Sequence, residues 1–175
     1  MLLIEKIGMN ILKLIKQRRS IRKFKPEEIS EELIKEILEA GRWAPSGLNN
    51  QPWRFMVLAG AKKDALAEYT KYSHIVKGCN KAVLVFMDKD ILYNFEKDLM
   101  AVGACVQNML LYIHSRGLGA CWLGEILNKR DEINKFLKLS ENLILEAVIA
   151  LGKSSVSSQK SPRKNLEDLI IKDEA

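Results

Sequence analysis

The N-terminal part of the chain shows the spacing of apolar residues that is typical of helices. Apolar positions within residues 11–15 share one helical face, and Asn10 directly before them is a suitable N-cap. Ser30 can cap a second helix, whose buried face comes from apolar positions within residues 33–38, and we expect Gly41 to end it. Two helices separated by a basic segment are therefore predicted.

The middle of the chain adds strands and a long apolar helix. Residues 53–59 are predicted to form a strand and residues 61–72 a surface helix. Residues 83–87 are apolar throughout, which indicates a strand covered on both faces. Residues 98–114 are apolar almost all round, so this predicted helix belongs at the centre of a core or in a subunit interface.

The last part continues the alternation of strands and helices. We expect a short strand or turn at residues 120–123, an amphipathic helix at 129–139 and a strand at 143–151. A flexible polar loop is predicted at 153–158, followed by an apolar arm at 166–171. Because strands alternate with helices, the fold class is predicted to be α+β or α/β with a mixed sheet.

Composition and length fit one globular domain over residues 1–175. The chain is 47% hydrophobic and 29% charged, and no apolar stretch reaches the roughly 20 residues that a membrane-spanning helix needs. Residues 1–6 lack the positive and long apolar segments of a signal peptide. The three cysteines, Cys79, Cys105 and Cys121, are far apart, which argues against a disulfide framework or a zinc site. A cytoplasmic location is therefore expected.

The net charge of +6 is concentrated in two basic stretches. Residues 16–25 contain six cations and no acid, and residues 160–164 contain three more cations. The run at 18–22, Arg-Arg-Ser-Ile-Arg, can clamp a phosphate with guanidinium forks and a hydroxyl group. The alternative is a solvated basic loop. Nucleic acid is a weaker interpretation, because no aromatic residues alternate with the cations to stack on bases.

A loop bounded by two prolines follows the second predicted helix. Between Pro45 and Pro52 it carries Ser46, Asn49 and Gln51, whose side chains offer both hydrogen-bond donors and acceptors. That mixture suits the edge of a heterocycle or a ribityl chain better than it suits a metal ion. The alternative is a structural turn that binds no ligand.

Glycines cluster in residues 117–124, Gly-Leu-Gly-Ala-Cys-Trp-Leu-Gly. The stretch follows a helix and has Trp122 at the last position of a G-x-G-x-x-G pattern, so it is neither a dinucleotide fingerprint nor a P-loop. Its glycines would let the backbone approach a planar ligand closely, or they simply end the preceding helix. Cys121 has no histidine near it in sequence, and His74 and His114 are expected to be ordinary surface and helix residues.

Taken in this order, the segments resemble the nitroreductase family of FMN-dependent oxidoreductases. The resemblance covers residues 10–170 and is carried by four motifs: Arg18-Arg19-Ser20-Ile21-Arg22, Pro45-Ser46-x-x-Asn49-x-Gln51-Pro52-Trp53, residues 107–111 leading into 117–124, and Pro162-Arg163-Lys164-Asn165-Leu166-Glu167-Asp168. It implies an α+β fold with a central mixed, mainly antiparallel sheet flanked by helices. It also implies an intertwined homodimer with its active sites at the interface.

The resemblance also implies which residues contact the cofactor, FMN. The phosphate and ribityl chain would be held by Arg18, Arg19, Ser20 and Arg163, and the ring would be met by Arg22, Pro45, Ser46, Gly47, Asn49, Gln51, Trp122, Leu123 and Gly124. Arg22 would lie near the pyrimidine side, where a cation stabilises the anionic reduced flavin. The loop from Pro45 would reach the flavin held mainly by the other subunit, and a backbone N–H of residues 122–124 would point at N5.

Two departures from the family pattern affect these expectations. Asn165 replaces a common proline, and Lys164 could share the role given to Arg163. The chain is also short for the family and lacks its longer helical insertion, so we expect an open substrate channel whose specificity the sequence does not reveal.

The activity implied is a ping-pong hydride transfer. NAD(P)H donates hydride to flavin N5 and leaves, and an electron-poor acceptor such as a nitroaromatic or a quinone then takes the electrons. The scheme needs no acid, base or metal from the protein. The alternative from another class is a flavin-binding storage or sensor protein without significant turnover. The expected partners are a second copy of the chain, NAD(P)H and the acceptor, with neither nucleic acid nor membrane.

Overall fold

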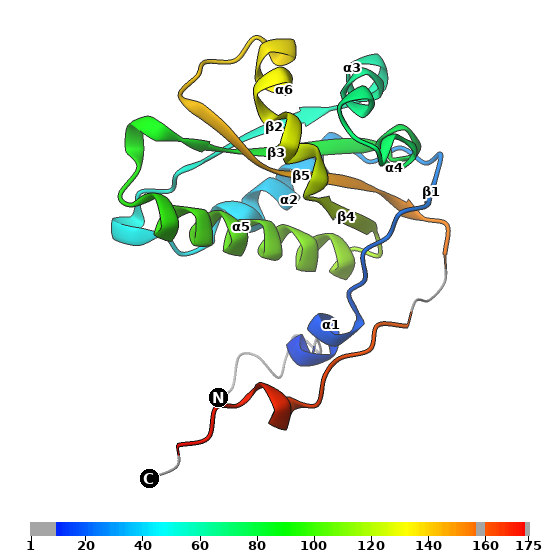
Figure 1. Cartoon of the computed structure of the whole chain (residues 1–175). Helices are drawn as coiled ribbons and strands as arrows, with labels where there is room; N and C mark the ends of the chain where they lie inside the picture. Colours follow the sequence, from blue (N-terminus) through cyan, green and yellow to red (C-terminus); the bar gives the residue numbers. More distant parts are fainter. Residues whose placement is uncertain (1–9, 157–159, 174–175) are drawn as a thin grey trace.

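The computed structural model describes residues 10–156 and 160–173 (Figure 1). The α-helices are α1 (Ile11–Gln17), α2 (Glu31–Arg42), α3 (Gly60–Leu66), α4 (Ser73–Gly78), α5 (Phe95–Ser115) and α6 (Arg130–Leu137). The 3-10 helices are η2 (Gly47–Asn49), η3 (Ala67–Tyr69), η4 (Lys89–Ile91), η5 (Glu125–Lys129) and η6 (Leu166–Leu169). The strands are β1 (Phe24–Lys25), β2 (Trp53–Leu58), β3 (Lys81–Asp88), β4 (Gly119–Leu123) and β5 (Leu143–Ser154). The predictions for residues 1–6 and for 157–158 of the polar loop lie outside the described residues.

One sheet organises the fold, and β5 is its longest strand. The strand order is β1-β5-β3-β2, with β4 also paired to β5, and these pairings are antiparallel. A single parallel bridge joins Ser20 to Ala120. The predicted class, α+β with a mixed and mainly antiparallel sheet, is confirmed.

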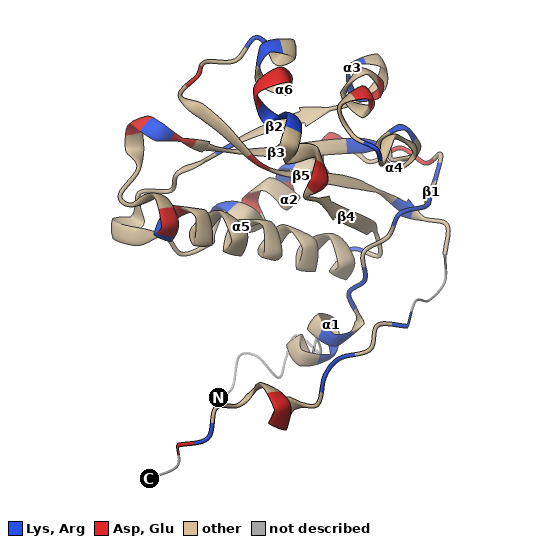
Figure 2. Cartoon of the chain, viewed as in Figure 1, with Lys and Arg blue, Asp and Glu red and all other residues tan. Residues whose placement is uncertain are grey.

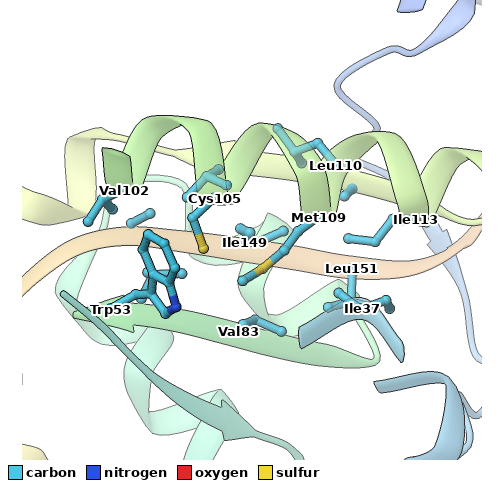
Figure 3. Close-up of a cluster of buried hydrophobic side chains, with 14 of the residues drawn as sticks. Ile37, Trp53, Val83, Val102, Cys105, Met109, Leu110, Ile113, Ile149 and Leu151 are labelled. Carbon is cyan, nitrogen blue, oxygen red and sulfur yellow. The ribbon is translucent and has the colours of Figure 1, made fainter. Parts of the chain in front are cut away.

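The two faces of the sheet are both covered by helices. Alternate residues of β3 show this: Val83 and Val85 lie in the core beneath α2 and α5, whereas Leu84 and Phe86 lie in the core beneath α3, α4 and α6. Figure 3 shows the first of these cores, where side chains of α5 point towards Trp53 and the strands. Because side chains of a strand alternate between faces, the apolar run 83–87 within β3 needs cover on both sides, as predicted.

The long helix α5 supplies much of the first core. Its buried residues include Val102, Cys105, Met109 and Ile113, while Met100 on another side is 68% exposed. The prediction of a central helix is thus confirmed for one face, and the opposite apolar face reaches the surface of the chain. This exposed face is available to a further partner.

The prediction that Gly41 ends the second helix is wrong. α2 continues to Arg42, and Gly41 is buried where α2 crosses α5. A Cβ atom at this position would clash with Met109 and would lie 3.0 Å from Cys105 Sγ. The glycine therefore serves the close approach of two helices rather than the end of one.

The prediction of one helix over residues 61–72 is also wrong. α3 ends at Leu66, η3 follows, and an unpredicted α4 begins at Ser73. Thr70 between them is extended, and its hydroxyl group accepts a hydrogen bond from Tyr72 N (3.1 Å) while donating one to Glu125 Oε2 (2.6 Å). Such bonds compete with helical ones, which explains the interruption. The helix predicted at 129–139 is present as the shorter α6, which directly follows η5. Smaller differences are that β5 extends to Ser154 and that β1 was not predicted.

Both ends of the described chain project away from the sheet. We call α1 together with residues 160–173 the terminal projection; Figure 1 shows it below the layered body, near the end of α5. α1 has no buried residue, and Leu12 is 59% exposed. The apolar arm predicted at 166–171 is present and exposed, with Ile171 99% accessible.

No helix in the described part of the chain is both long and apolar enough to span a membrane.

Candidate functional site

The basic segment after α1 is fastened to the sheet. Ile21 N donates a hydrogen bond to Ala120 O (2.8 Å), and Ser20 forms the parallel bridge to the same residue. Gly119 makes this approach possible, because a Cβ atom there would lie 2.7 Å from Ile21 Cβ. Two motifs that are far apart in sequence, at residues 18–22 and 117–124, are therefore brought side by side.

Three arginines predicted to bind phosphate come together at the base of the terminal projection. The pKa of Arg18 is lowered by burial and then by the charges of Arg163 and Arg19. Arg19 is held by hydrogen bonds to Lys16 O (2.6 Å) and Arg18 O (2.8 Å), and Arg163 donates to Pro162 O (2.9 Å). Figure 2 shows cations along both segments that contribute to this cluster. An anion placed here would offset the mutual repulsion of the guanidinium groups.

His114 also belongs to this region, although the sequence analysis assigned it no role in a site. Burial lowers the pKa of its imidazole, and the charges of Arg18 and Arg19 lower it further. The C-terminal end of α5 therefore lies within electrostatic range of the arginine cluster. Nothing in the sequence around His114 indicated this, because the electrostatic interaction joins residues almost a hundred positions apart.

A small cavity lies beside the arginine cluster. It has a volume of about 170 Å³ and is lined by Arg22, Tyr72, Ile75, Cys121, Trp122, Leu123 and Gly124. Arg22 is held in place by a hydrogen bond from Nη1 to Ser20 O (3.2 Å), and the Trp122 side chain is half-exposed. Tyr72 and Ile75 were missed by the sequence analysis. The bonds of Thr70 to Tyr72 N and to Glu125 hold this segment beside the residues that follow β4.

The cysteines of the described chain are free thiols, and Cys121 is the one that lines this cavity. Burial raises its pKa, an effect that nearby Arg22 and Arg18 partly offset. Burial likewise raises the pKa of Cys79 to about 11 and that of Cys105 to about 12. A reactive cysteine needs a lowered pKa, so these thiols act as packing groups. In residues 10–156 and 160–173, no His, Cys, Asp and Glu side chains are grouped to hold a metal ion.

The predicted loop at residues 45–51 lies at the opposite end of α5. Asn50 Nδ2 donates a hydrogen bond to Asp98 Oδ1 (3.0 Å) in the first turn of that helix, while Ser46 Oγ accepts one from Gln51 N (3.0 Å). Pro45 and Asn49 are exposed on this loop. The prolines do not fix its shape alone, since these hydrogen bonds also hold it.

The predicted site residues therefore form two separate groups within one chain. Asp98, beside the loop, and His114, beside the arginine cluster, are separated by 16 residues of α5, which is about 24 Å at 1.5 Å per residue. Residues 18–22, 122–124 and Arg163 belong to one group, and residues 45–51 belong to the other. A second cavity, of about 430 Å³ beside α6, contains none of the predicted residues.

The comparisons with known proteins agree on one family. The family model "Nitroreductase family" matches residues 15–90 and 79–153. A protein of Methanothermobacter thermautotrophicus, provisionally named an NADH dehydrogenase/NAD(P)H nitroreductase, is 34% identical over 149 residues, covering 82% of this chain and 77% of its own. A crystal structure of a provisionally named nitroreductase from Desulfovibrio desulfuricans in complex with FMN is 46% identical, with a TM-score of 0.90, covering 94% of this chain and 97% of the other. A provisionally named NADH oxidase from Clostridium acetobutylicum is 30% identical with a TM-score of 0.83, covering 90% and 97% of the two chains.

Proposed function

Because the chain belongs to the nitroreductase family, we propose that it transfers hydride from NAD(P)H through bound FMN to electron-poor acceptors such as nitroaromatics and quinones. The class of enzyme, a flavin-dependent oxidoreductase, follows from the family and from relatives named as NAD(P)H nitroreductases. The acceptors, the site residues, a single domain over the whole chain and a location in the cytoplasm are the parts that we propose.

The grouping of Arg18, Arg19 and Arg163 is the observation that carries the proposal. Burial lowers the pKa of Arg18, and the charges of Arg163 and Arg19 lower it further, so an FMN phosphate would be attracted to a site where cations already repel one another. Ser20, bridged to the start of β4, would add a hydroxyl group to the phosphate or the ribityl chain. Charge-assisted hydrogen bonds of this kind are the strong ones.

The cavity beside the arginines suits the ring of the same cofactor. FMN supplies the capacity to accept hydride and pass electrons on, so the protein needs to bind, orient and tune it. Arg22 would stabilise negative charge on the pyrimidine side, and Trp122, Leu123 and Gly124 would lie along the ring. The thiol of Cys121, with its raised pKa, would pack against this site without reacting.

The site would be completed by a second copy of the chain. A cavity of about 170 Å³ is smaller than the range of about 300–1,000 Å³ usual for ligand pockets. The loop with Pro45, Ser46, Gly47, Asn49 and Gln51 lies beside Asp98 at the start of α5, and Arg18 and Arg19 lie near His114 at its end, about 24 Å further along the helix, so one chain does not bring both to the same ring. We therefore propose a homodimer in which this loop meets the flavin held by the partner. Sedimentation of a stable, flavin-loaded monomer at micromolar concentration would contradict it.

The affinities for FMN and for riboflavin test whether Arg18 and Ser20 hold the phosphate. Replacing Arg18 and Ser20 by alanine is expected to weaken FMN far more than riboflavin, because each lost charge-assisted contact is worth roughly 1.5–3 kcal/mol and riboflavin lacks the phosphate. Lys62→Ala, on the exposed side of α3, serves as the control and should change neither affinity. Equal losses for the two flavins would show that these residues do not hold the phosphate.

A second experiment tests the ring end of the site. Arg22→Ala should lower the reduction potential of the bound flavin, because it removes a cation beside developing negative charge. Cys121→Ser should leave turnover with one quinone and one nitroaromatic nearly intact. An unchanged potential in the first variant, or an inactive second variant, would contradict the proposed roles.

A further inference from the structure

A buried carboxylate anchors the loop at residues 46–51, which we call the flavin loop. Asp98 is fully buried and accepts hydrogen bonds from Asn50 Nδ2 (3.0 Å), Tyr93 N (2.7 Å) and Asn94 N (3.1 Å). None of the ion pairs in the described part of the chain includes it. Burying a charge without a cation is costly unless hydrogen bonds compensate for lost water, so these three donors must stay in place.

Asn50 is the member of this group that comes from the flavin loop. Its amide nitrogen donates to both Asp98 Oδ1 and Ile91 O, each at 3.0 Å, so its two hydrogens tie the loop to the segment before α5. Its amide oxygen is buried and lacks a hydrogen-bond partner. The side chain therefore leaves one polar atom unsatisfied in order to make the other two bonds.

The backbone that Asn50 holds is in an unfavourable conformation. Leu48, Asn49 and Gln51 have φ angles of 53°, 56° and 49°, in the left-handed region that residues with a side chain rarely adopt. Such conformations persist where the surroundings enforce them, and they cluster at functional sites. Asn50 lies within this run, so its bonds to Asp98 and Ile91 are placed to enforce it.

Tyr93 links the anchor to another residue of the flavin loop. Its ring lies so close to Gly47 that a Cβ atom there would be 2.6 Å from the ring carbon Cδ1. The backbone N–H of the same tyrosine donates to Asp98. The Asp98 carboxylate therefore holds both Asn50 and Tyr93, whose ring packs against Gly47.

We propose that Asn50 and Asp98 are positioning residues that hold the flavin loop in the shape needed to meet the flavin ring. The inference rests on the proposed function, in which this loop contacts the ring held by the other subunit. Neither residue would touch the flavin. Both act through Ser46, Gly47 and Asn49, so their loss should weaken binding of the ring and leave the phosphate contacts unchanged.

The affinities of the full-length protein for FMN and for riboflavin test this proposal. Asn50→Ala and Asp98→Asn are each expected to weaken both flavins by the same factor, about tenfold or more, because each removes a hydrogen bond to a charged group or the charge itself. Arg18→Ala should instead weaken FMN selectively. The control is Asn134→Ala, which removes a similar bond from Asn134 Nδ2 to Leu143 O (2.6 Å) between α6 and β5 and should change neither affinity.

An exchange of the two side chains separates positioning from general damage to the fold. In the double variant N50D/D98N, the amide at position 98 can donate to the carboxylate at position 50, so the pair bond returns with its direction reversed, while the bond to Ile91 O is lost. The matched reference is Asn50→Asp, which also lacks the Ile91 bond and sets two carboxylates against each other, and we expect the exchange to recover at least threefold of the affinity for both flavins relative to it. If Asp98→Asn does not fold, Asn50→Ala and Asn50→Asp carry the test, since Asn50 is only half-buried.

Three results would overturn the inference: single variants that bind both flavins within twofold of the wild type, a loss confined to FMN, or an exchange that recovers nothing. A failure of the proposed function has a different signature, because Arg18→Ala would then weaken both flavins equally.

Mixing Asn50→Ala with Arg18→Ala protein adds a check on the shared site. A mixed dimer regains one intact site when loop and arginines come from different subunits, and it regains none when they come from the same subunit.

Discussion

Strand β3 and helix α1 are both rich in apolar residues, yet their surroundings are opposite. Residues 81–87 of β3 are all buried, whereas α1 contains no buried residue. The strand is covered by helices on both faces, and the helix lies in the terminal projection with little of the chain around it (Figure 1). Similar composition therefore leads to a core in one place and to an exposed apolar surface in the other.

The difference shows where the chain can stabilise itself and where it needs a partner. Burying an aliphatic or aromatic side chain is worth about 1.5–3 kcal/mol, and the terminal projection forgoes this gain at many positions. These are Ile11, Leu12, Ile15, Leu166, Leu169, Ile170 and Ile171, each exposed by 46% or more. Apolar patches of this kind mark interaction sites, which supports the proposed homodimer.

The largest effect is expected in the sheet core. Phe86 is 1% exposed beneath α3, α4 and α6, so Phe86→Ala should lower the free energy of unfolding by about 3–5 kcal/mol. Urea denaturation measures the change. A loss below 1 kcal/mol, on the order expected of a surface residue, would mean that this face of the sheet is not the core described here.

Two glycines in helices sharpen the contrast between packed and open positions. Gly41→Ala should destabilise the fold by about 1–3 kcal/mol, because the new methyl group meets Met109 and Cys105. Gly103 on α5 has nothing within 4 Å of an added Cβ, so Gly103→Ala should stabilise the chain by up to about 1 kcal/mol through helix propensity. Thermal unfolding of both variants compares them directly. A destabilising Gly103→Ala would show that this side of α5 is covered in solution.

A pH effect is expected where α5 meets the arginine cluster. The pKa of His114 lies below its usual 6.5, because burial and the charges of Arg18 and Arg19 disfavour the charged imidazole. The unfolded chain therefore takes up a proton at higher pH than the folded chain. The free energy of unfolding should fall as pH drops from 6.5 towards the folded pKa, and His114→Gln should remove this slope. Urea unfolding at several pH values measures it; identical slopes in the two proteins would contradict the assignment.

The smallest effect on the single chain is expected in the terminal projection. Leu169 is 62% exposed, so Leu169→Ser should change the unfolding free energy of an isolated chain by less than about 0.5 kcal/mol. Its effect should instead appear in association. The wild-type melting temperature is expected to rise with protein concentration, and this dependence should weaken in the variant. A melting temperature that is independent of protein concentration in both proteins would show that the terminal projection does not mediate association of two chains.

Local features of the sequence were sufficient to predict how several elements begin. Asn10 Oδ1 accepts a hydrogen bond from Lys13 N (2.9 Å), and Ser30 Oγ accepts one from Leu33 N (3.2 Å), as their N-cap positions require. The apolar run in β3 and the stretch within α5 were likewise predictable. Capping and amphipathic spacing act over a few residues, so they leave a signal that can be read without the fold.

The motif residues themselves were also determined by the sequence, but their grouping was decided by the tertiary structure. Arg18 and Arg163 interact electrostatically although they are 145 positions apart. The loop that contains Gln51 lies at the first turn of α5, whereas Arg22, part of the same predicted site, lies beside β4, which follows the last turn of α5. Thr70 interrupts a predicted helix through a bond to Glu125, and Gly41 is buried against a helix more than sixty residues away. Contacts between distant segments have no local period and depend on which surfaces the sheet brings together. For that reason the sequence by itself determined the elements and the chemistry of the motifs, while the packing around β5 and α5 decided which of them share a site.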